Sequence, residues 1–358
     1  MWPNRSLLDL FAIEHPIVLA PMAGAMDFEL AAEVAEGGGL GSLPCGMLSP
    51  SAIRLQVDQY RARTRKPVNL NFFCHTQPSL NNARENAWRE RLKPYYLELG
   101  VDPAAPVPSS HRAPFDATFC EAVEQLTPEV VSFHYGLPDA GLMKRVKSAG
   151  ARIISSATTV KEARWLEQHG ADAVIAQGFE AGGHRAMFLH DDVASQVGTF
   201  ALLPQVVDAV RVPVIASGAI SDARGIAAAL ALGAAGVQIG SAYLHCPESK
   251  ISAPYRAALN GVSDDATTLT NVMSGRPARG IANRLIREVG PISPLAPEFP
   301  LATGAIAPLR ARAEAAGSGD FSPLWAGQAT GLGLALPARQ LTHKLAAEAQ
   351  SLLRSLAV

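Results

Sequence analysis

Short, continuous apolar runs recur along the chain and alternate with longer amphipathic or Ala-rich segments. Continuous apolar runs are typical of parallel strands that are covered on both faces, because neither face then needs polar residues. We predict eight such strands, at residues 17–20, 41–44, 68–73, 130–134, 152–155, 173–176, 212–217 and 236–240. Helical segments between them would make the chain a repeated strand–helix unit.

Capping residues mark several boundaries of the predicted helices. Asp27 and Ser221 are each expected to cap a helix, and Thr159 with Glu162 has the form of a capping box. Three helices are expected to end at a Gly-Ala pair that leads into a strand, at residues 150–151, 170–171 and 233–234. This regularity predicts an α/β fold, a TIM (β/α)₈ barrel, since closure of eight parallel strands leaves no sheet edge.

Two regions interrupt the strand–helix pattern. Residues 75–115 form a long insertion with several prolines, and residues 246–337 are rich in Pro, Gly and Arg. We expect residues 1–245 to form the barrel, completed by a C-terminal helix at residues 338–358. Residues 246–337 are expected to form a smaller, mostly helical insertion that acts as a lid or substrate subdomain.

Composition limits the function classes. Hydrophobic residues make up 48% and charged residues 18% of the 358 residues, which suits a soluble protein with a large core. The net charge of −1 argues against nucleic acid and anionic membranes as partners. The four cysteines are scattered without a C-x-x-C pair, so we expect neither a zinc site nor disulfides, and a cytoplasmic location. The oligomeric state is left open, and a homodimer is compatible with the sequence.

Polar and glycine residues follow the predicted strands at the end where barrel enzymes carry their chemistry. Glycines after strands seven and eight, Gly218 and Gly240, suit a phosphate site because the main chain can approach a ligand closely. The alternative is that they only make tight turns. The amides of Asn71 and Gln177 suit a flat heterocycle, or else an internally satisfied polar layer.

His184 is the leading candidate for chemistry. Its ordinary pKa near 6.5 suits a general base, and the preceding Gly182-Gly183 pair allows the loop to present the ring. Metal binding with Glu180 is disfavoured, because the spacing is not H-E-x-x-H and glycines oppose a helix there. His134 is a second candidate at a strand end, with a core or capping role as the alternative.

Several segments together resemble the nitronate monooxygenases, formerly called 2-nitropropane dioxygenases. They are Ala20-Pro21-Met22, Asn71-Phe72-Phe73, Gln177 through His184, Ser217 through Ile220, Gln238 through Ser241 and Ser274 through Gly280. The resemblance implies FMN in a TIM barrel. It implies His184 as the catalytic base and a substrate-binding residue, and His134 as a substrate-pocket residue. The implied FMN-binding residues are Ala20, Pro21, Met22, Asn71, Gln177, Gly182, Gly183, Gly218, Ala219, Gln238, Ile239, Gly240 and Ser241.

The implied reaction is oxidation of an alkyl nitronate by O₂ to a carbonyl compound and nitrite. His184 would remove the α-proton of a neutral nitroalkane, or hold a nitronate anion when protonated. Ala186 and Ala219 depart from the glycines that are common at their positions, and neither change removes a reacting group. The alternatives are an NAD(P)H-dependent flavin reductase on the same barrel and a non-redox, phosphate-binding barrel enzyme.

Overall fold

Eight parallel strands form the centre of the computed structural model, which describes residues 2–108 and 112–356. Their order is β1-β9-β8-β6-β5-β4-β3-β2. A parallel bridge between Val18 and Leu40 joins the two ends of this series, so the strands close into a barrel. The barrel strands are β1 (Ile17–Leu19), β2 (Gly41–Pro44), β3 (Val68–Phe73), β4 (Val130–His134), β5 (Arg152–Ala157), β6 (Ala173–Gln177), β8 (Val214–Ser217) and β9 (Gly236–Ile239).

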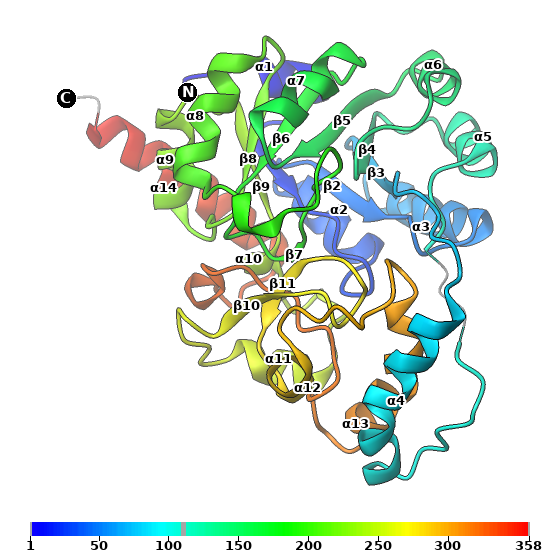
Figure 1. Ribbon diagram of the computed structural model, residues 1–358. Coiled ribbons are helices and arrows are strands. Elements are labelled where there is room, and N and C mark those ends of the chain that lie inside the picture. The colour runs from blue at the N-terminus through cyan, green and yellow to red at the C-terminus, as the bar shows by residue number, and fades with distance from the viewer. Residues whose placement is uncertain (1, 109–111, 357–358) are drawn as a thin grey trace.

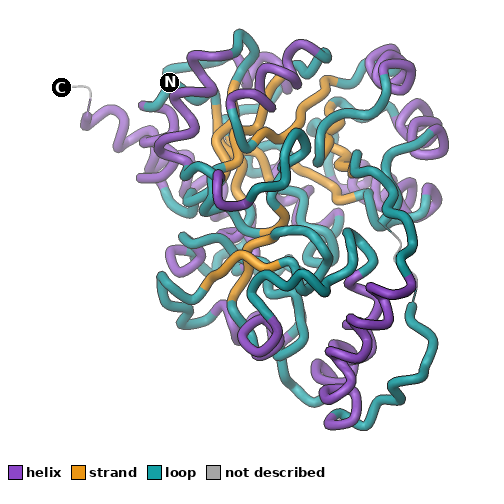
Figure 2. The backbone as a smooth tube through the Cα atoms, in the orientation of Figure 1, coloured by secondary structure: helices purple, strands orange, loops and turns teal. Residues whose placement is uncertain are grey.

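Helices surround the barrel, with the strands inside (Figures 1 and 2). The C-terminal helix α14 (Ala338–Leu356) packs against α2 and α9. The other helices next to the strands are α1 (Ser6–Phe11), α2 (Phe28–Glu36), α3 (Pro50–Arg63), α5 (Ala117–Leu126), α6 (Ala140–Ser148), α7 (Val160–Gln168), α8 (Thr199–Ala209), α9 (Ala223–Ala231) and α10 (Ser241–Leu244). Two short 3₁₀ helices, η1 (Val193–Ser195) and η2 (Thr330–Leu332), lie in loops.

The predicted barrel is confirmed, and each of the eight strands lies within two residues of its predicted bounds. The apolar runs were informative because the strands are covered on both faces: the burial of β1, β3 and β6 is almost complete. The glycines of the three Gly-Ala pairs have left-handed φ values of 92°, 93° and 95°. Glycine adopts this conformation without steric cost, which ends each helix and turns the chain toward the next strand.

Two of the predicted helix caps are confirmed and one is wrong. Asp27 caps α2 through its bond from Glu29 N at 2.9 Å, and Thr159 caps α7 through its bond from Glu162 N at 3.1 Å. The cap of α9 is not Ser221 but Asp222, whose carboxylate accepts from two main-chain N–H groups of the first turn. A carboxylate accepts more strongly than a hydroxyl, and it sits at the residue where extended backbone meets the helix.

The segment after the barrel contains helices and a small sheet. The helices are α11 (Ala253–Leu259), α12 (Arg284–Val289) and α13 (Ala302–Ala315). Strands β10 (Thr267–Thr270) and β11 (Ala278–Ile281) form a three-stranded sheet with β7 (Gly183–His184), which comes from the loop after β6. The sequence did not predict this sheet. It joins the post-barrel segment directly to the loop that contains His184.

A second apolar core forms where two distant parts of the chain meet. Helix α4 (Asn82–Glu98), from the early insertion, lies beside α13 (Figure 1). Trp88 and Leu92 of α4 are fully buried together with Leu285 and Leu309. We therefore propose that the second packing unit of the molecule contains α4 in addition to residues 246–337.

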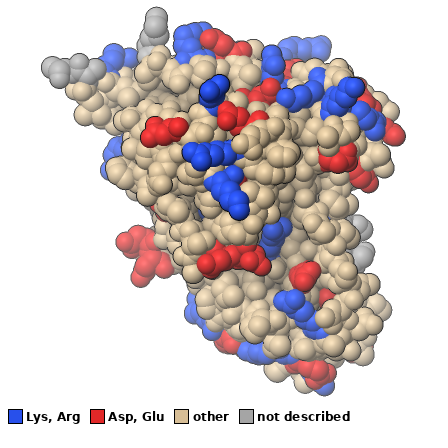
Figure 3. All heavy atoms as spheres, turned by 45° about the horizontal axis from the view of Figure 1, so that its top comes forward, with Lys and Arg blue, Asp and Glu red and all other residues tan. Residues whose placement is uncertain are grey.

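On the face shown in Figure 3, Lys and Arg side chains are interspersed with Asp and Glu. No helix within the described part of the chain is long and apolar enough to cross a membrane.

Glu162 of α7 is a fully buried carboxylate that connects the helix to two loops. One oxygen accepts from the main-chain N–H and the hydroxyl of Thr158, both at 2.7 Å. The other accepts from the N–H groups of Phe188 at 2.7 Å and Leu189 at 3.2 Å. These four bonds fix the loop that follows His184 against the barrel.

Glu162→Gln is expected to lower the free energy of unfolding by about 2 kcal/mol, because two of the four donors would then face an amide NH₂ group. Urea unfolding followed by circular dichroism measures the change. Glu121→Gln, on the exposed side of α5, is the matched control and is expected to change stability by less than about 0.5 kcal/mol. Equal stability of the two variants would contradict the structural role of Glu162.

Candidate active site

A cavity of about 350 Å³ lies at the end of the barrel where the strands lead into their loops. This volume falls within the range of roughly 300–1,000 Å³ that is usual for small-molecule sites. The wall is formed by strand-end residues of the barrel, by Arg112 from the early insertion, and by residues of the second packing unit such as Tyr255 and Trp325. The cavity is therefore enclosed by both parts of the molecule.

Nearly all of the site residues predicted from the sequence line this one cavity. They are Ala20, Pro21, Met22, Asn71, His134, Gln177, Gly182, Gly183, His184, Gly218, Ala219, Gln238, Gly240 and Ser241. Ile239 is the exception, since its side chain is 1% exposed and belongs to the barrel core. Its carbonyl instead accepts from Ala20 N at 2.8 Å, which ties the loop after β1 to the loop after β9.

The loop from Gln177 to Arg185 is held by buried polar groups. The Gln177 amide donates to His184 O at 3.0 Å and accepts from Ala186 N at 2.9 Å. Arg185 is 1% exposed, and its guanidinium donates to Gly178 O at 2.5 Å and to Gln177 O at 2.8 Å. The side chains of Gln177 and Arg185 therefore join the two ends of the loop. Because the Gln177 amide binds the main-chain carbonyl of His184, the backbone at His184 is held in place.

His184 is also attached to the second packing unit. It pairs with Ala278 in the ladder between β7 and β11, and Arg185 N donates to Pro277 O at 2.9 Å. The ring Nε2 lies 2.8 Å from Ser274 Oγ. Ser274 Oγ also lies 3.3 Å from Arg276 O, and when its hydroxyl donates there, its oxygen accepts from His184 Nε2–H.

The surroundings of His184 are aromatic and cationic. Its ring centroid lies 5.2 Å from that of Phe299 and 5.3 Å from that of Trp325. Burial holds the pKa of His184 well below its ordinary value, and the positive charge of Arg112 lowers it further. His184 is therefore neutral at pH 7 and keeps a basic nitrogen.

His134 lies beside His184, as a residue at the end of β4. Its Nε2 is 3.2 Å from His184 O. Burial lowers the pKa of His134 to about 4, so its ring is also neutral at pH 7. His134 therefore contacts the main chain of His184 and lines the same cavity.

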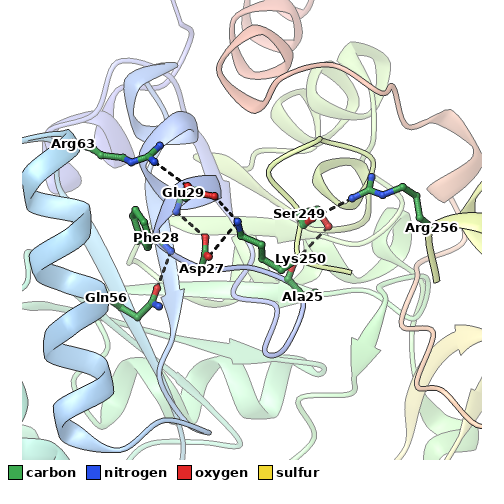
Figure 4. Close-up of polar contacts among 9 residues, drawn as sticks. All are labelled: Ala25, Asp27, Phe28, Glu29, Gln56, Arg63, Ser249, Lys250 and Arg256. Atoms are coloured by element: carbon green, nitrogen blue, oxygen red, sulfur yellow. Dashed lines mark hydrogen bonds and ion pairs between the residues drawn. The ribbon is translucent and has the colours of Figure 1, made fainter. Parts of the chain in front are cut away.

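A network of charges holds the loop after β1 (Figure 4). Lys250 forms ion pairs with Asp27, at 3.4 Å, and with Glu29, while its main-chain N–H donates to Ala25 O at 2.8 Å. The same loop carries Ala20 to Met22 along the cavity. The network therefore fixes one wall of the cavity to the start of the post-barrel segment.

Three features of the wall fit a bound cofactor. Gln238 Oε1 is buried without a hydrogen-bond partner among the described residues. Within the same residues, the main-chain N–H groups of Gly218, Ala219 and Gly240 have no acceptor. A Cβ at Gly182 would lie 2.5 Å from Gly327 N, so glycine allows two loops to meet there. Unpaired donors and acceptors at a cavity indicate a polar ligand that pairs with them.

The structure gives no support to metal binding around Glu180. Its carboxylate accepts from Thr199 N and Thr199 Oγ1, both at 2.8 Å, and so caps α8. No group of three or more His, Cys, Asp or Glu side chains able to hold a metal occurs among the residues that the structure describes.

Sequence reasoning missed several residues of the site. Ser274, Phe299 and Trp325 surround the His184 ring, and Arg112 comes from the early insertion. Ser274 is the first residue of the 274–280 segment that resembles the nitronate monooxygenases, and this resemblance was the only sequence signal for it. The others have no local pattern, because their positions follow from packing between parts of the chain that are far apart in sequence.

Comparison with known proteins identifies the family and agrees with the fold. The family model described as nitronate monooxygenase matches residues 4–348. A nitronate monooxygenase of Paraburkholderia phytofirmans is 41% identical, with 96% of this chain and 95% of that protein covered. One from Pseudomonas aeruginosa is 40% identical, with coverages of 95% and 97%. The solved structure of a nitroalkane oxidase from Streptomyces ansochromogenes is 36% identical with a TM-score of 0.89, covering 99% of this chain and 100% of that one. The chain belongs to the nitronate monooxygenase family and is an oxidoreductase.

Proposed function

We propose that the enzyme is an FMN-dependent nitronate monooxygenase, which oxidises alkyl nitronates such as propionate 3-nitronate with O₂ to a carbonyl compound and nitrite. The observation that carries the proposal is the buried His184, whose pKa is lowered, at a cavity that also contains main-chain N–H groups without an acceptor among the described residues. Relatives named nitronate monooxygenase and a structural neighbour named nitroalkane oxidase support this choice of substrate.

The residues of the cavity suit FMN. The free N–H groups of Gly218, Ala219 and Gly240 provide donors for a phosphate, and the unpaired Gln238 Oε1 provides an acceptor. Ala20 to Met22 and Asn71 line the part of the cavity that would border the flavin. FMN, when bound, supplies the redox chemistry with O₂.

His184 acts as the base toward neutral nitroalkanes. Ser274 holds Nε2 in its protonated form, which leaves Nδ1 as the basic nitrogen for the α-proton of the substrate. Gln177 and Arg185 fix the main chain around it, so they act as positioning residues. With a nitronate the proton is already absent, and His184 is not required as a base.

Anaerobic mixing tests the proposed function. The purified protein is expected to be yellow, and propionate 3-nitronate is expected to bleach the flavin absorbance, while NADH does so slowly or not at all. Rapid bleaching by NADH, with none by the nitronate, would favour the flavin reductase. A colourless protein that FMN does not reconstitute would reject the flavin.

His184→Asn is expected to lower kcat/KM for a neutral nitroalkane by about 10²–10⁴-fold, the usual contribution of a general base. The loss with the corresponding nitronate should be far smaller. His169→Asn, an exposed histidine on the outside of the barrel, is the control and should leave both values unchanged. Equal losses with both substrates would show that His184 does not act as the base.

The pH dependence of the wild-type enzyme gives an independent test of His184. Because its pKa is lowered, the basic form persists below the ordinary value of 6.5. We expect kcat/KM for a neutral nitroalkane to stay level from pH 7.5 down through the ordinary histidine pKa and to fall only at lower pH. An acidic limb centred at or above the ordinary histidine pKa would contradict the assigned protonation state.

The loop after β8 tests the phosphate site. Gly218 has a φ of 117°, and a Cβ there would lie 2.8 Å from Thr199 Oγ1. Gly218→Ala is therefore expected to weaken FMN retention by at least about tenfold, measured by fluorescence of released flavin. Ala219, with a left-handed φ of 58°, is the matched position: Ala219→Gly relieves strain there and should retain FMN as well as the wild type. Equal retention by both variants would place the phosphate elsewhere.

A further inference from the structure

Three basic side chains line the cavity, and they differ in their ionic partners. Lys250 is paired with Asp27 and Glu29, and Arg310 is paired with Glu314 at 2.9 Å. Arg112 has no carboxylate partner among the described residues. The single acidic residue of the lining, Glu180, is bound to Thr199. Among the described residues, the cavity lining therefore contains one Lys or Arg side chain without a carboxylate partner, Arg112.

The position of Arg112 is defined by the second packing unit. Its Nη1 donates to Thr303 Oγ1 at 2.9 Å, and its guanidinium carbon lies 5.9 Å from the ring centre of Phe299. The His184 ring contacts the same phenylalanine, at 5.2 Å between centroids. Arg112 and His184 therefore both lie next to Phe299 in the lining of the cavity. Thr303 uses one of the five guanidinium N–H groups, which leaves others for a ligand.

A second guanidinium strengthens the positive potential near His184. Arg276 lies over the Tyr135 ring at 4.2 Å and also has no carboxylate partner among the described residues. Tyr135 has a left-handed φ of 73° and is 3% exposed. A bulky residue rarely adopts this conformation, and it persists where the surrounding structure enforces it. His75 and His134 are nearby histidines whose pKa values are lowered, so they add no charge at neutral pH, whereas Arg310 adds to the positive potential that acts on Arg112.

We propose that Arg112 binds the oxygens of the substrate's anionic nitro group and thereby selects nitronates over neutral nitroalkanes. This inference rests on the proposed function and assigns to Arg112 the anion-holding task that a protonated His184 would otherwise perform.

The chemistry of both partners favours this contact. A nitronate has two oxygens in one plane, which match the parallel N–H donors of a guanidinium in the way that a carboxylate does. An unpaired cation in a partly buried site is costly, and burial lowers the pKa of Arg112 accordingly. An anionic ligand removes this cost. Neutral His184 cannot compete for the anion, so the two residues divide the work between charge recognition and proton removal.

Nitrate is the probe for binding, because it is a planar oxyanion that the enzyme does not oxidise. Isothermal titration calorimetry of the holoenzyme is expected to show nitrate binding that Arg112→Gln weakens by at least about tenfold. Arg112→Lys, which keeps the charge but not the paired donors, should give an intermediate loss. Arg164→Gln, an exposed arginine on α7, is the charge-matched control and should bind nitrate as the wild type does.

Steady-state kinetics separates recognition from a general structural effect. Arg112→Gln should raise KM for propionate 3-nitronate by at least about tenfold and leave KM for a neutral nitroalkane within about twofold. Equal KM changes for the two substrates, or nitrate binding unaffected by either Arg112 variant, would overturn the inference. If Arg112→Gln fails to retain flavin, the KM values and the nitrate affinity of Arg112→Lys provide the test instead. A wild-type enzyme that binds nitrate through Arg112 but does not oxidise nitronates would reject the proposed function and leave the anion site standing.

Discussion

The closure of the loop after β6 by buried polar side chains is the interaction on which the site depends. Arg185 is almost fully buried and has no ionic partner among the described residues. Its guanidinium donates to the carbonyls of Gln177 and Gly178 and to the side-chain oxygen of Gln196. Burial lowers the pKa of Arg185 to about 10, which still leaves it charged at neutral pH. A buried cation satisfied by main-chain carbonyls holds those groups firmly, because leaving them unpaired would be costly. The loop is thereby a fixed part of the barrel.

This closed loop connects the two packing units. On one side Gln177 ends a barrel strand, and on the other Gly183 and His184 pair with β11 of the post-barrel sheet. Ser274, Phe299 and Trp325, which lie next to the His184 ring, come from that second unit. The chemistry therefore depends on the relative position of two hydrophobic cores, and His184 lies where they meet. The same arrangement buries His184 and His134, and this burial lowers the pKa of each ring.

The sequence predicted the barrel well because its signal is local. Parallel strands covered on both faces need apolar runs, and left-handed glycines end helices wherever the chain turns back to a strand. It also predicted which strand ends meet, since the carboxyl ends of barrel strands share one face. Ser221 was the wrong choice of cap because two adjacent residues were both suitable, and the structure alone distinguishes them.

The remaining features of the site depend on contacts over long sequence separations. Ser274 is 90 residues from His184, and Arg112 reaches its position through Thr303, 191 residues away. The Gln177 amide binds His184 O and Ala186 N, and these two contacts also follow from tertiary structure. The sequence around a glutamine at a strand end does not show whether its side chain contacts a ligand or a loop. A resemblance to a family identified the residues, whereas their hydrogen bonds came from the structure.

The central claim is that the unpaired donors and acceptors of the cavity are there for FMN, with His184 on the substrate side. A crystal structure of the purified holoenzyme tests it most directly. The account predicts a single FMN whose phosphate accepts hydrogen bonds from the main chain of Gly218, Ala219 and Gly240. Gln238 would contact the cofactor, and His184 would face the flavin across the space left for the substrate. A flavin phosphate bound at another part of the chain, or a cavity in which these N–H groups bind only water, would contradict it.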